Sequence, residues 1–148
     1  MTRAAVLREV ICVETPGGRS AHLVLFANER WLPLESAYPE EVRRERERGL
    51  RLAQVALLEG AGSTAAILRL FQAAWARILD LELDVVYAAV DEDDVPLYAR
   101  LLFERTNWGN ARWDFADYAE VEVLRLDVTT VRERAGRALA ARFLRGRE

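Results

Sequence analysis

The segment LRLAQVALLEGAGSTAAILRLF, residues 50–71, decides the fold. Residues 50–58 form a mostly apolar run of strand length, which is typical of an interior strand. From residue 64 onward the apolar residues recur with a helical period of 3.6. They are Ile67, Leu68, Phe71, Trp75, Ile78 and Leu79. The segment therefore predicts a buried strand, a short glycine turn and a long amphipathic helix in direct succession.

The turn EGAGST, residues 59–64, has two interpretations. Gly60 and Gly62 can simply reverse the chain while Ser63 or Thr64 caps the helix. Alternatively, the turn can cradle a phosphate, because the unpaired N–H groups and the dipole at a helix start favour negative charge. The residues alone leave both interpretations open.

The flanking sequence continues the alternation of strands and helices. AVLREVICVE and AHLVLFA, separated by TPGGRS, predict an antiparallel hairpin. PEEVRRERERGL predicts a short helix that ends at Gly49, with either a solvated face of ion pairs or a docking surface for an acidic partner. LELDVVYAAV and YAEVEVLRLDV predict two further strands, the second with a one-residue bulge, and DEDDVPLYARLLFE predicts a turn and helix.

The tail, residues 129–148, predicts an amphipathic helix that packs on the domain or across a homodimer. The whole chain, residues 1–148, then forms a single α/β domain in the order β-β-α-β-α-β-α-β-α, with a mixed, mostly antiparallel central sheet flanked by helices.

Composition argues against several classes of protein. The net charge of −3 provides no general attraction for nucleic acid, and no apolar run approaches the ~18 residues of a membrane span. Cys12 is the only cysteine and His22 the only histidine of the chain, and the acidic run at residues 91–94 lacks the spacing of a calcium loop. We therefore expect no metal site. Cys12 lies in the apolar run VICV, where we expect a buried thiol. Without a signal peptide, the expected compartment is the cytoplasm.

The order of elements resembles the core of the GNAT superfamily of N-acyltransferases. LPLESAYPEEVRRERERGLRLAQVALL, residues 32–58, resembles a subgroup related to long-chain N-acyl amino acid synthases and acyl-homoserine-lactone synthases, in which a run like GRRLAEV leads into the central strand. VYAAVDEDDVPLYARLLFE resembles the subgroup's next strand and a helix of the type FYRRLLGFE, and AEVEVLRLDV resembles its closing strand.

This resemblance implies an N-terminally shortened GNAT-like acyltransferase fold. It implies an acyl thioester, on coenzyme A or an acyl carrier protein, as co-substrate, a small amine as acceptor, and no tightly bound cofactor. The donor is expected to lie against the end of the central strand and the turn. The donor-binding residues are then Leu57, Leu58, Gly60, Gly62, Ser63 and Thr64.

Three side chains are candidates for the chemistry. Tyr98 matches the position that often acts as the general acid, although a buried tyrosine with one hydrogen bond is the alternative. Gln54 stands where the subgroup has a glutamate, so it can orient an amine but cannot accept its proton at neutral pH. Glu59 can serve as the base or be a solvated carboxylate. Because Gln54 and the short turn depart from the subgroup, a catalytically degenerate GNAT-like binding module is the alternative function.

Trp108 and Trp113 flank Gly109 in a segment that either walls an acyl pocket or packs as an ordinary loop.

Overall fold

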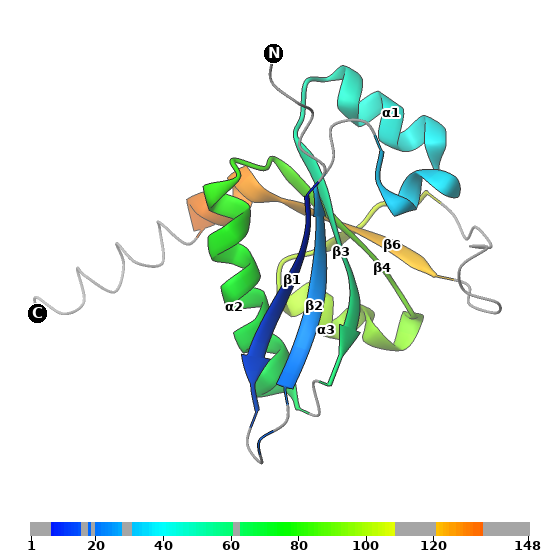
Figure 1. Ribbon diagram of the computed structural model, residues 1–148. Coiled ribbons are helices and arrows are strands. Elements are labelled where there is room, and N and C mark those ends of the chain that lie inside the picture. Colours follow the sequence, from blue (N-terminus) through cyan, green and yellow to red (C-terminus); the bar gives the residue numbers. More distant parts are fainter. Residues whose placement is uncertain are drawn as a thin grey trace, which may run out of the picture.

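The computed structural model describes residues 7–15, 18, 20–27, 31–60, 63–108 and 121–134. Their centre is one six-stranded sheet (Figure 1). The strands are β1 (Leu7–Glu14), β2 (Ser20–Ala27), β3 (Leu52–Glu59), β4 (Val85–Val90), β5 (Glu104–Arg105) and β6 (Glu122–Asp127). The helices before residue 128 are α1 (Pro39–Glu47), α2 (Thr64–Asp80) and α3 (Val95–Arg100), with the 3-10 turns η1 (Pro33–Ser36) and η2 (Glu92–Asp94) before α1 and α3.

The strand order is β1-β2-β3-β4-β6-β5. β3 and β4 are parallel, and the other neighbouring strands pair antiparallel. Parallel neighbours need a crossover connection, which α2 supplies here. The predicted α/β class, with its mixed and mostly antiparallel sheet, is confirmed.

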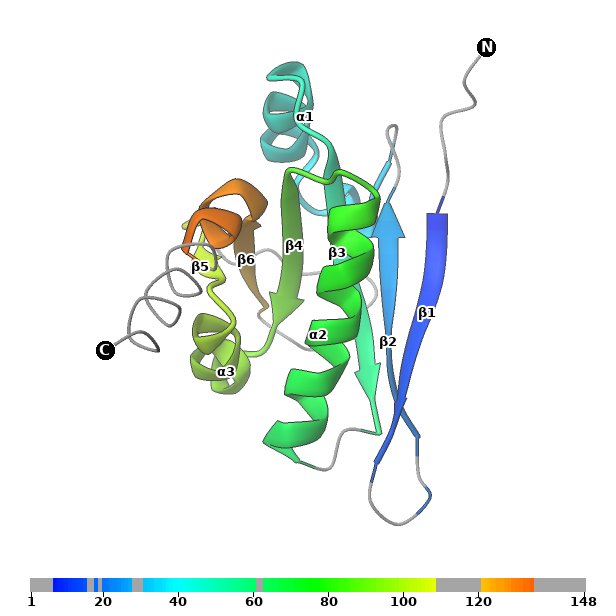
Figure 2. The same ribbon diagram turned by 90° about the vertical axis from the view of Figure 1, so that its left-hand side faces the viewer.

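α2 packs on one face of the sheet, where the larger hydrophobic core lies (Figure 2). Ser63 begins the helix by accepting a hydrogen bond from the backbone N–H of Ala66. The buried residues of α2 are spaced by four positions: Ala66, Leu70, Ala74 and Ile78. The larger Phe71 and Trp75 lie beside this line and are only partly buried, while Leu68 is exposed. The sequence pattern therefore located the helix but placed its buried stripe slightly off centre.

η1 and α1 cover the other face of the sheet with a second, smaller core. Leu32, Leu34, Tyr38 and Val42 pack there against β3, β4 and β6. Gly49 follows α1 in the left-handed conformation, with φ of 78°. On the outer side of α1, Arg43 forms ion pairs with Glu40 and Glu47, as the solvated-face interpretation expects.

Two details predicted from the sequence are wrong. β6 pairs with β4 in an unbroken register from Val85↔Asp127 to Val90↔Glu122, so it contains no bulge. Its apolar phase changes because Val123 packs in the core under α1, whereas Leu124 packs in the core under α2. Cys12 is exposed, because the alternation of β1 points Ile11, and not Cys12, toward α2.

The predicted tail helix is described only at its start. Residues 128–134 are helical, and Asp127 caps them by accepting a hydrogen bond from Thr130 N–H at 2.9 Å. The remainder of the predicted helix lies outside the described residues.

Candidate functional site

The central feature of the site is a fork between the two parallel strands. β3 and β4 pair only from Leu52↔Val85 to Val55↔Ala88, yet β3 continues to Glu59. Figure 1 shows the strands diverging beyond this point. The β2–β3 register also shifts here, between His22↔Glu59 and Val24↔Ala56. Such a bulge bends the strand that carries it, and we attribute the divergence of β3 from β4 to this bend.

The turn after β3 and the start of α2 hold four of the predicted donor-binding residues, and three of them are described. Gly60 has φ of 75°, and a Cβ placed on it would overlap the carbonyl oxygen of Ser20 and lie 3.3 Å from Ala21 Cα. Gly60 therefore permits both the left-handed turn and the close approach of β2. Ser63 caps α2, and Thr64 is the first residue of the helix and is exposed. Gly62 lies outside the described residues.

Three further predicted residues, Leu57, Leu58 and Glu59, lie on β3 beyond the fork. The structure describes the course of their backbone but not their side chains. Backbone groups that face the gap beyond Val55 have no β4 residue opposite them in the described register. They are therefore available to a ligand that enters the fork.

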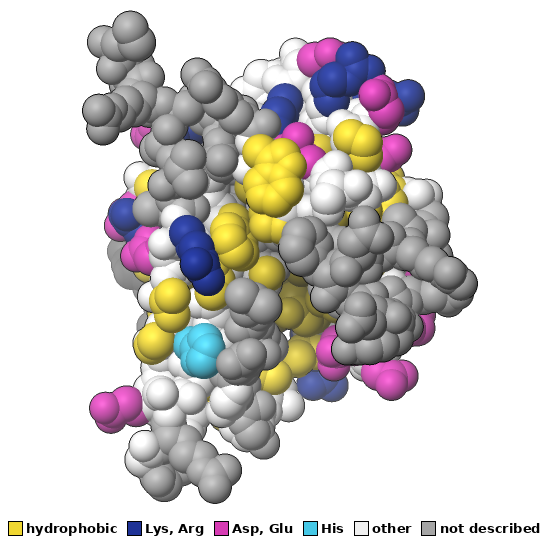
Figure 3. Space-filling view, turned by 45° about the vertical axis from the view of Figure 1, so that its right-hand side comes forward, with side chains coloured by type: hydrophobic (Ala, Val, Ile, Leu, Met, Phe, Trp, Pro, Cys, Tyr) yellow, Lys and Arg dark blue, Asp and Glu magenta, His cyan; other side chains and the backbone are white. Residues whose placement is uncertain are grey.

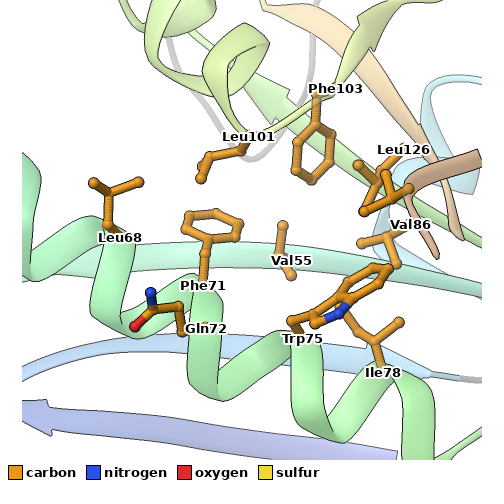
Figure 4. A pocket seen from close by; sticks show the side chains of 11 residues that line it. Val55, Leu68, Phe71, Gln72, Trp75, Ile78, Val86, Leu101, Phe103 and Leu126 are labelled. Atoms are coloured by element: carbon orange, nitrogen blue, oxygen red, sulfur yellow. The ribbon is translucent and has the colours of Figure 1, made fainter. Parts of the chain in front are cut away.

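An apolar cavity of about 320 Å³ opens on the α2 side of the fork (Figure 4). α2 contributes five of the eleven lining residues: Leu68, Phe71, Gln72, Trp75 and Ile78. The sheet contributes Val55, Val86 and Leu126, and the other wall is made by Leu101, Phe103 and Val131. Val55 is also the last residue of β3 that pairs with β4. The cavity thus begins where the strands part, and its volume lies at the lower end of ordinary ligand sites.

Tyr98 lies beside this cavity, on α3. Its ring packs edge-to-face against Phe71 and Phe103, with centroids 5.5 and 5.4 Å away. Both phenylalanines line the cavity. Tyr98 is only 6% exposed, and this burial, with a smaller effect of the Asp94 carboxylate, raises the pKa of Tyr98 to about 12. The phenol therefore stays protonated at neutral pH and can donate a hydrogen bond.

Gln54 lies on the opposite face of the sheet from Tyr98. It is 1% exposed, and its side-chain oxygen accepts a hydrogen bond from the backbone N–H of Leu34 at 2.8 Å. Gln54 thereby fastens η1 to β3 next to the fork. The structure does not bring Gln54 and Tyr98 together on one surface: they lie on opposite faces of the sheet, on either side of the fork.

Sequence reasoning missed a polar group beside Gln54. Tyr87, opposite Gln54 on β4, is fully buried, and its hydroxyl has no hydrogen-bond partner of normal geometry among the described residues. Burial, and then the charge of Glu45, hold the pKa of Tyr87 far above its usual value. Glu45 in turn pairs with Arg125 at 2.8 Å, and both side chains are largely buried. The one sign of this group in the sequence was that Tyr87 lies inside an apolar run of strand length.

Trp108 also belongs to this face and not to the cavity. Its ring lies 5.3 Å from that of Tyr87 and 5.6 Å from that of Tyr38. Among the described residues Trp108 packs over the second core, as the ordinary-loop interpretation expects. Trp113 lies outside the described residues.

Among known proteins, the chain is similar to solved structures. No family model matches the chain, and no curated protein matches it. The structure of FeeM, an N-acyl amino acid synthase from uncultured soil microbes, superposes with a TM-score of 0.65 at 19% sequence identity. The chain shares the fold of that synthase. The match covers 74% of this chain and 61% of FeeM, so the chain spans about three fifths of its neighbour. The match supports the acyltransferase-like fold that the resemblance implied.

The described part of the chain has neither a membrane-spanning helix nor a metal-binding cluster. None of its helices combines the length and apolarity that a bilayer crossing requires. In these same residues, no three histidine, cysteine, aspartate or glutamate side chains lie close enough to share a metal ion.

Proposed function

We propose that the protein is an N-acyltransferase that binds an acyl thioester, carried by coenzyme A or an acyl carrier protein, and transfers the acyl group to a small amine. The observation that carries this proposal is the position of Val55, which both ends the β3–β4 pairing and walls the apolar cavity. A thioester carbonyl at the fork can then extend its acyl chain into the cavity and its pantetheine arm along β3. The fold shared with an N-acyl amino acid synthase supports the same reaction class.

The pantetheine arm is an extended chain with amide groups, so it can pair with the free backbone edge of residues 56–59 as an added strand does. Its phosphate end then reaches the start of α2, where the first N–H groups lack intrahelical partners. The Ser63 hydroxyl oxygen accepts the hydrogen bond of Ala66 N–H. The N–H groups of Thr64 and Ala65 are then left for an anion. In this proposal residues 57–64 bind the donor through their backbone.

The reaction forms a C–N bond between amine and acyl carbon and breaks the C–S bond to the carrier. Backbone N–H groups of β3 beyond the fork are placed to stabilise the tetrahedral oxyanion. Tyr98 donates a hydrogen bond to the departing thiolate. Full proton transfer from a phenol with pKa about 12 to a thiolate near ~8.5 is uphill by ~3.5 pKa units, or ~5 kcal/mol. The proton that the thiolate finally receives therefore originates from the attacking amine.

The acceptor approaches from the α1 face in this proposal, because the donor fills the α2 face. Gln54 is a positioning residue there, since its hydrogen bond to Leu34 N–H holds η1 beside the fork. Glu59, at the end of β3, is the proposed carboxylate that removes the proton from the amine.

The second candidate function is a non-catalytic module that binds an acyl thioester. It is favoured by Gln54, which replaces a carboxylate with an amide whose oxygen is already engaged by Leu34 N–H. The two candidates differ in one outcome: a module protects a bound thioester from hydrolysis, whereas an enzyme converts it to an amide when an amine is added.

Donor affinity should depend on acyl length. Each methylene that enters the cavity contributes ~0.8 kcal/mol, so the dissociation constant for acyl-coenzyme A should fall about fourfold per methylene until the cavity is full. Isothermal titration of a series from acetyl to hexadecanoyl measures this dependence.

Two tryptophans provide a matched pair of variants for the same series. Trp75→Leu enlarges the cavity and should raise the preferred acyl chain length. Trp31→Leu alters a half-exposed ring outside the cavity and should leave the preferred chain length unchanged. Equal affinity for every chain length in the native protein would contradict an acyl site in this cavity.

A further inference from the structure

β1 is a long and regular edge strand. It has eight residues and pairs with β2 residue for residue, from Leu7↔Ala27 to Glu14↔Ser20, without a bulge. The other edge of the sheet, β5, has only two residues. Natural proteins protect exposed edges by shortening, bulging or covering them, because the free N–H and C=O groups of an edge recruit another strand. In the described part of the chain, β5 is protected by its shortness, whereas β1 is long, has no bulge or proline, and carries only the charges of Arg8, Glu9 and Glu14.

The two faces of β1 are unlike each other. Its odd-numbered residues belong to the α2 side, where Ile11 is buried and Glu9 pairs with Arg77 of α2 at 2.6 Å. Its even-numbered residues lie on the opposite side and are exposed, including Val10 at 55% and Cys12. Figure 3 shows hydrophobic side chains gathered on this side, near an arginine and the histidine of the chain. β1 thus presents both a free edge and an uncovered apolar surface.

We propose that β1 pairs antiparallel with β1 of a second copy of this chain, around a two-fold axis at Ile11, so that the two sheets become continuous. This register brings Arg8 opposite Glu14 and Val10 opposite Cys12, and each pair occurs twice because the interface is symmetric. Opposite charges directly across a ladder stabilise pairing, as do apolar neighbours.

Other registers of the same strand fit less well. A shift of two residues pairs Arg8 with Cys12 in one direction and Val10 with Glu14 in the other. A shift of one residue places the exposed side of one copy beside the α2 side of the other. Figure 2 shows β1 at the outer margin of the sheet, and no other strand of the described residues pairs with its outer side.

Charge exchange at Arg8 and Glu14 tests the pairing. Light scattering after gel filtration should give the native protein the mass of a dimer. On dilution this average mass should fall toward that of the monomer. Arg8→Glu and Glu14→Arg each create two like-charged pairs and should raise the dimer dissociation constant about tenfold or more. The double variant Arg8→Glu/Glu14→Arg restores opposite charges and should dimerise like the native protein. Both side chains are exposed, so circular dichroism should show a native fold throughout.

Three results would overturn the proposal. The first is a monomer at every concentration of the native protein. The second is a dimer that neither single exchange weakens, because the interface then lies elsewhere. The third is a dimer that is lost in the single variants and not regained in the double variant, because Arg8 and Glu14 are then not partners.

Discussion

In the Tyr98→Phe variant, acyl transfer is expected to fall about 10²–10³-fold, the usual loss when one hydrogen-bond donor to a developing anion is removed. The phenyl ring preserves the edge-to-face contacts with Phe71 and Phe103, so the melting temperature and the affinity for acyl-coenzyme A should stay near native. Single-turnover rates with saturating donor separate this loss from any change in binding.

Tyr87→Phe is the matched control for Tyr98→Phe. Tyr87 is also a buried tyrosine with a raised pKa, but it lies on the α1 face and its hydroxyl has no hydrogen-bond partner of normal geometry among the described residues. Its removal should leave the rate of acyl transfer unchanged. Native rates in Tyr98→Phe, or equal losses in both variants, would remove Tyr98 from the mechanism.

The Gly60→Ala variant is expected to lose about 3 kcal/mol or more of unfolding free energy. Alanine at φ of 75° carries backbone strain of ~1–3 kcal/mol, and its Cβ would overlap the carbonyl oxygen of Ser20 on β2, which adds ~1–3 kcal/mol of overpacking. Urea unfolding followed by circular dichroism gives the difference.

Gly49→Ala isolates the strain from the overlap. Gly49 has almost the same φ, 78°, but a Cβ there meets no atom within 4 Å. The Gly49→Ala variant should therefore lose only the unfolding free energy that the backbone strain costs, about 1 kcal/mol. Equal losses at Gly49 and Gly60 would show that the close approach of β2 does not constrain the turn.

Local patterns predicted the elements that form the fork. The apolar run before residue 59, the glycine turn and the helical period after residue 64 are all properties of neighbouring residues, so β3 and α2 could be located from the sequence. A buried tyrosine was one of the two interpretations of Tyr98 from the sequence, and Tyr98 is buried.

Other features depend on contacts between distant residues. Gln54 is bonded to Leu34, twenty residues away, and Glu45 to Arg125, eighty residues away, so α1 carries a buried carboxylate that its solvated pattern concealed. The cavity needs Val55, Leu101 and Val131 together, from three separate parts of the chain. Cys12 resembled a core residue because its run is apolar, but β1 lies at an edge and only one of its faces is covered.

The central claim is that a thioester at the β3–β4 fork loses its acyl group to an amine. The most direct measurement is mass spectrometry of a reaction containing the native protein, dodecanoyl-coenzyme A and a panel of small primary amines that includes free amino acids. Our proposal predicts an N-dodecanoyl amide together with an equal amount of free coenzyme A, both formed much faster than without protein and slowed in Tyr98→Phe. Thioester that remains intact with every amine, in a protein that is folded and binds the donor, would contradict the claim and leave the binding module as the function.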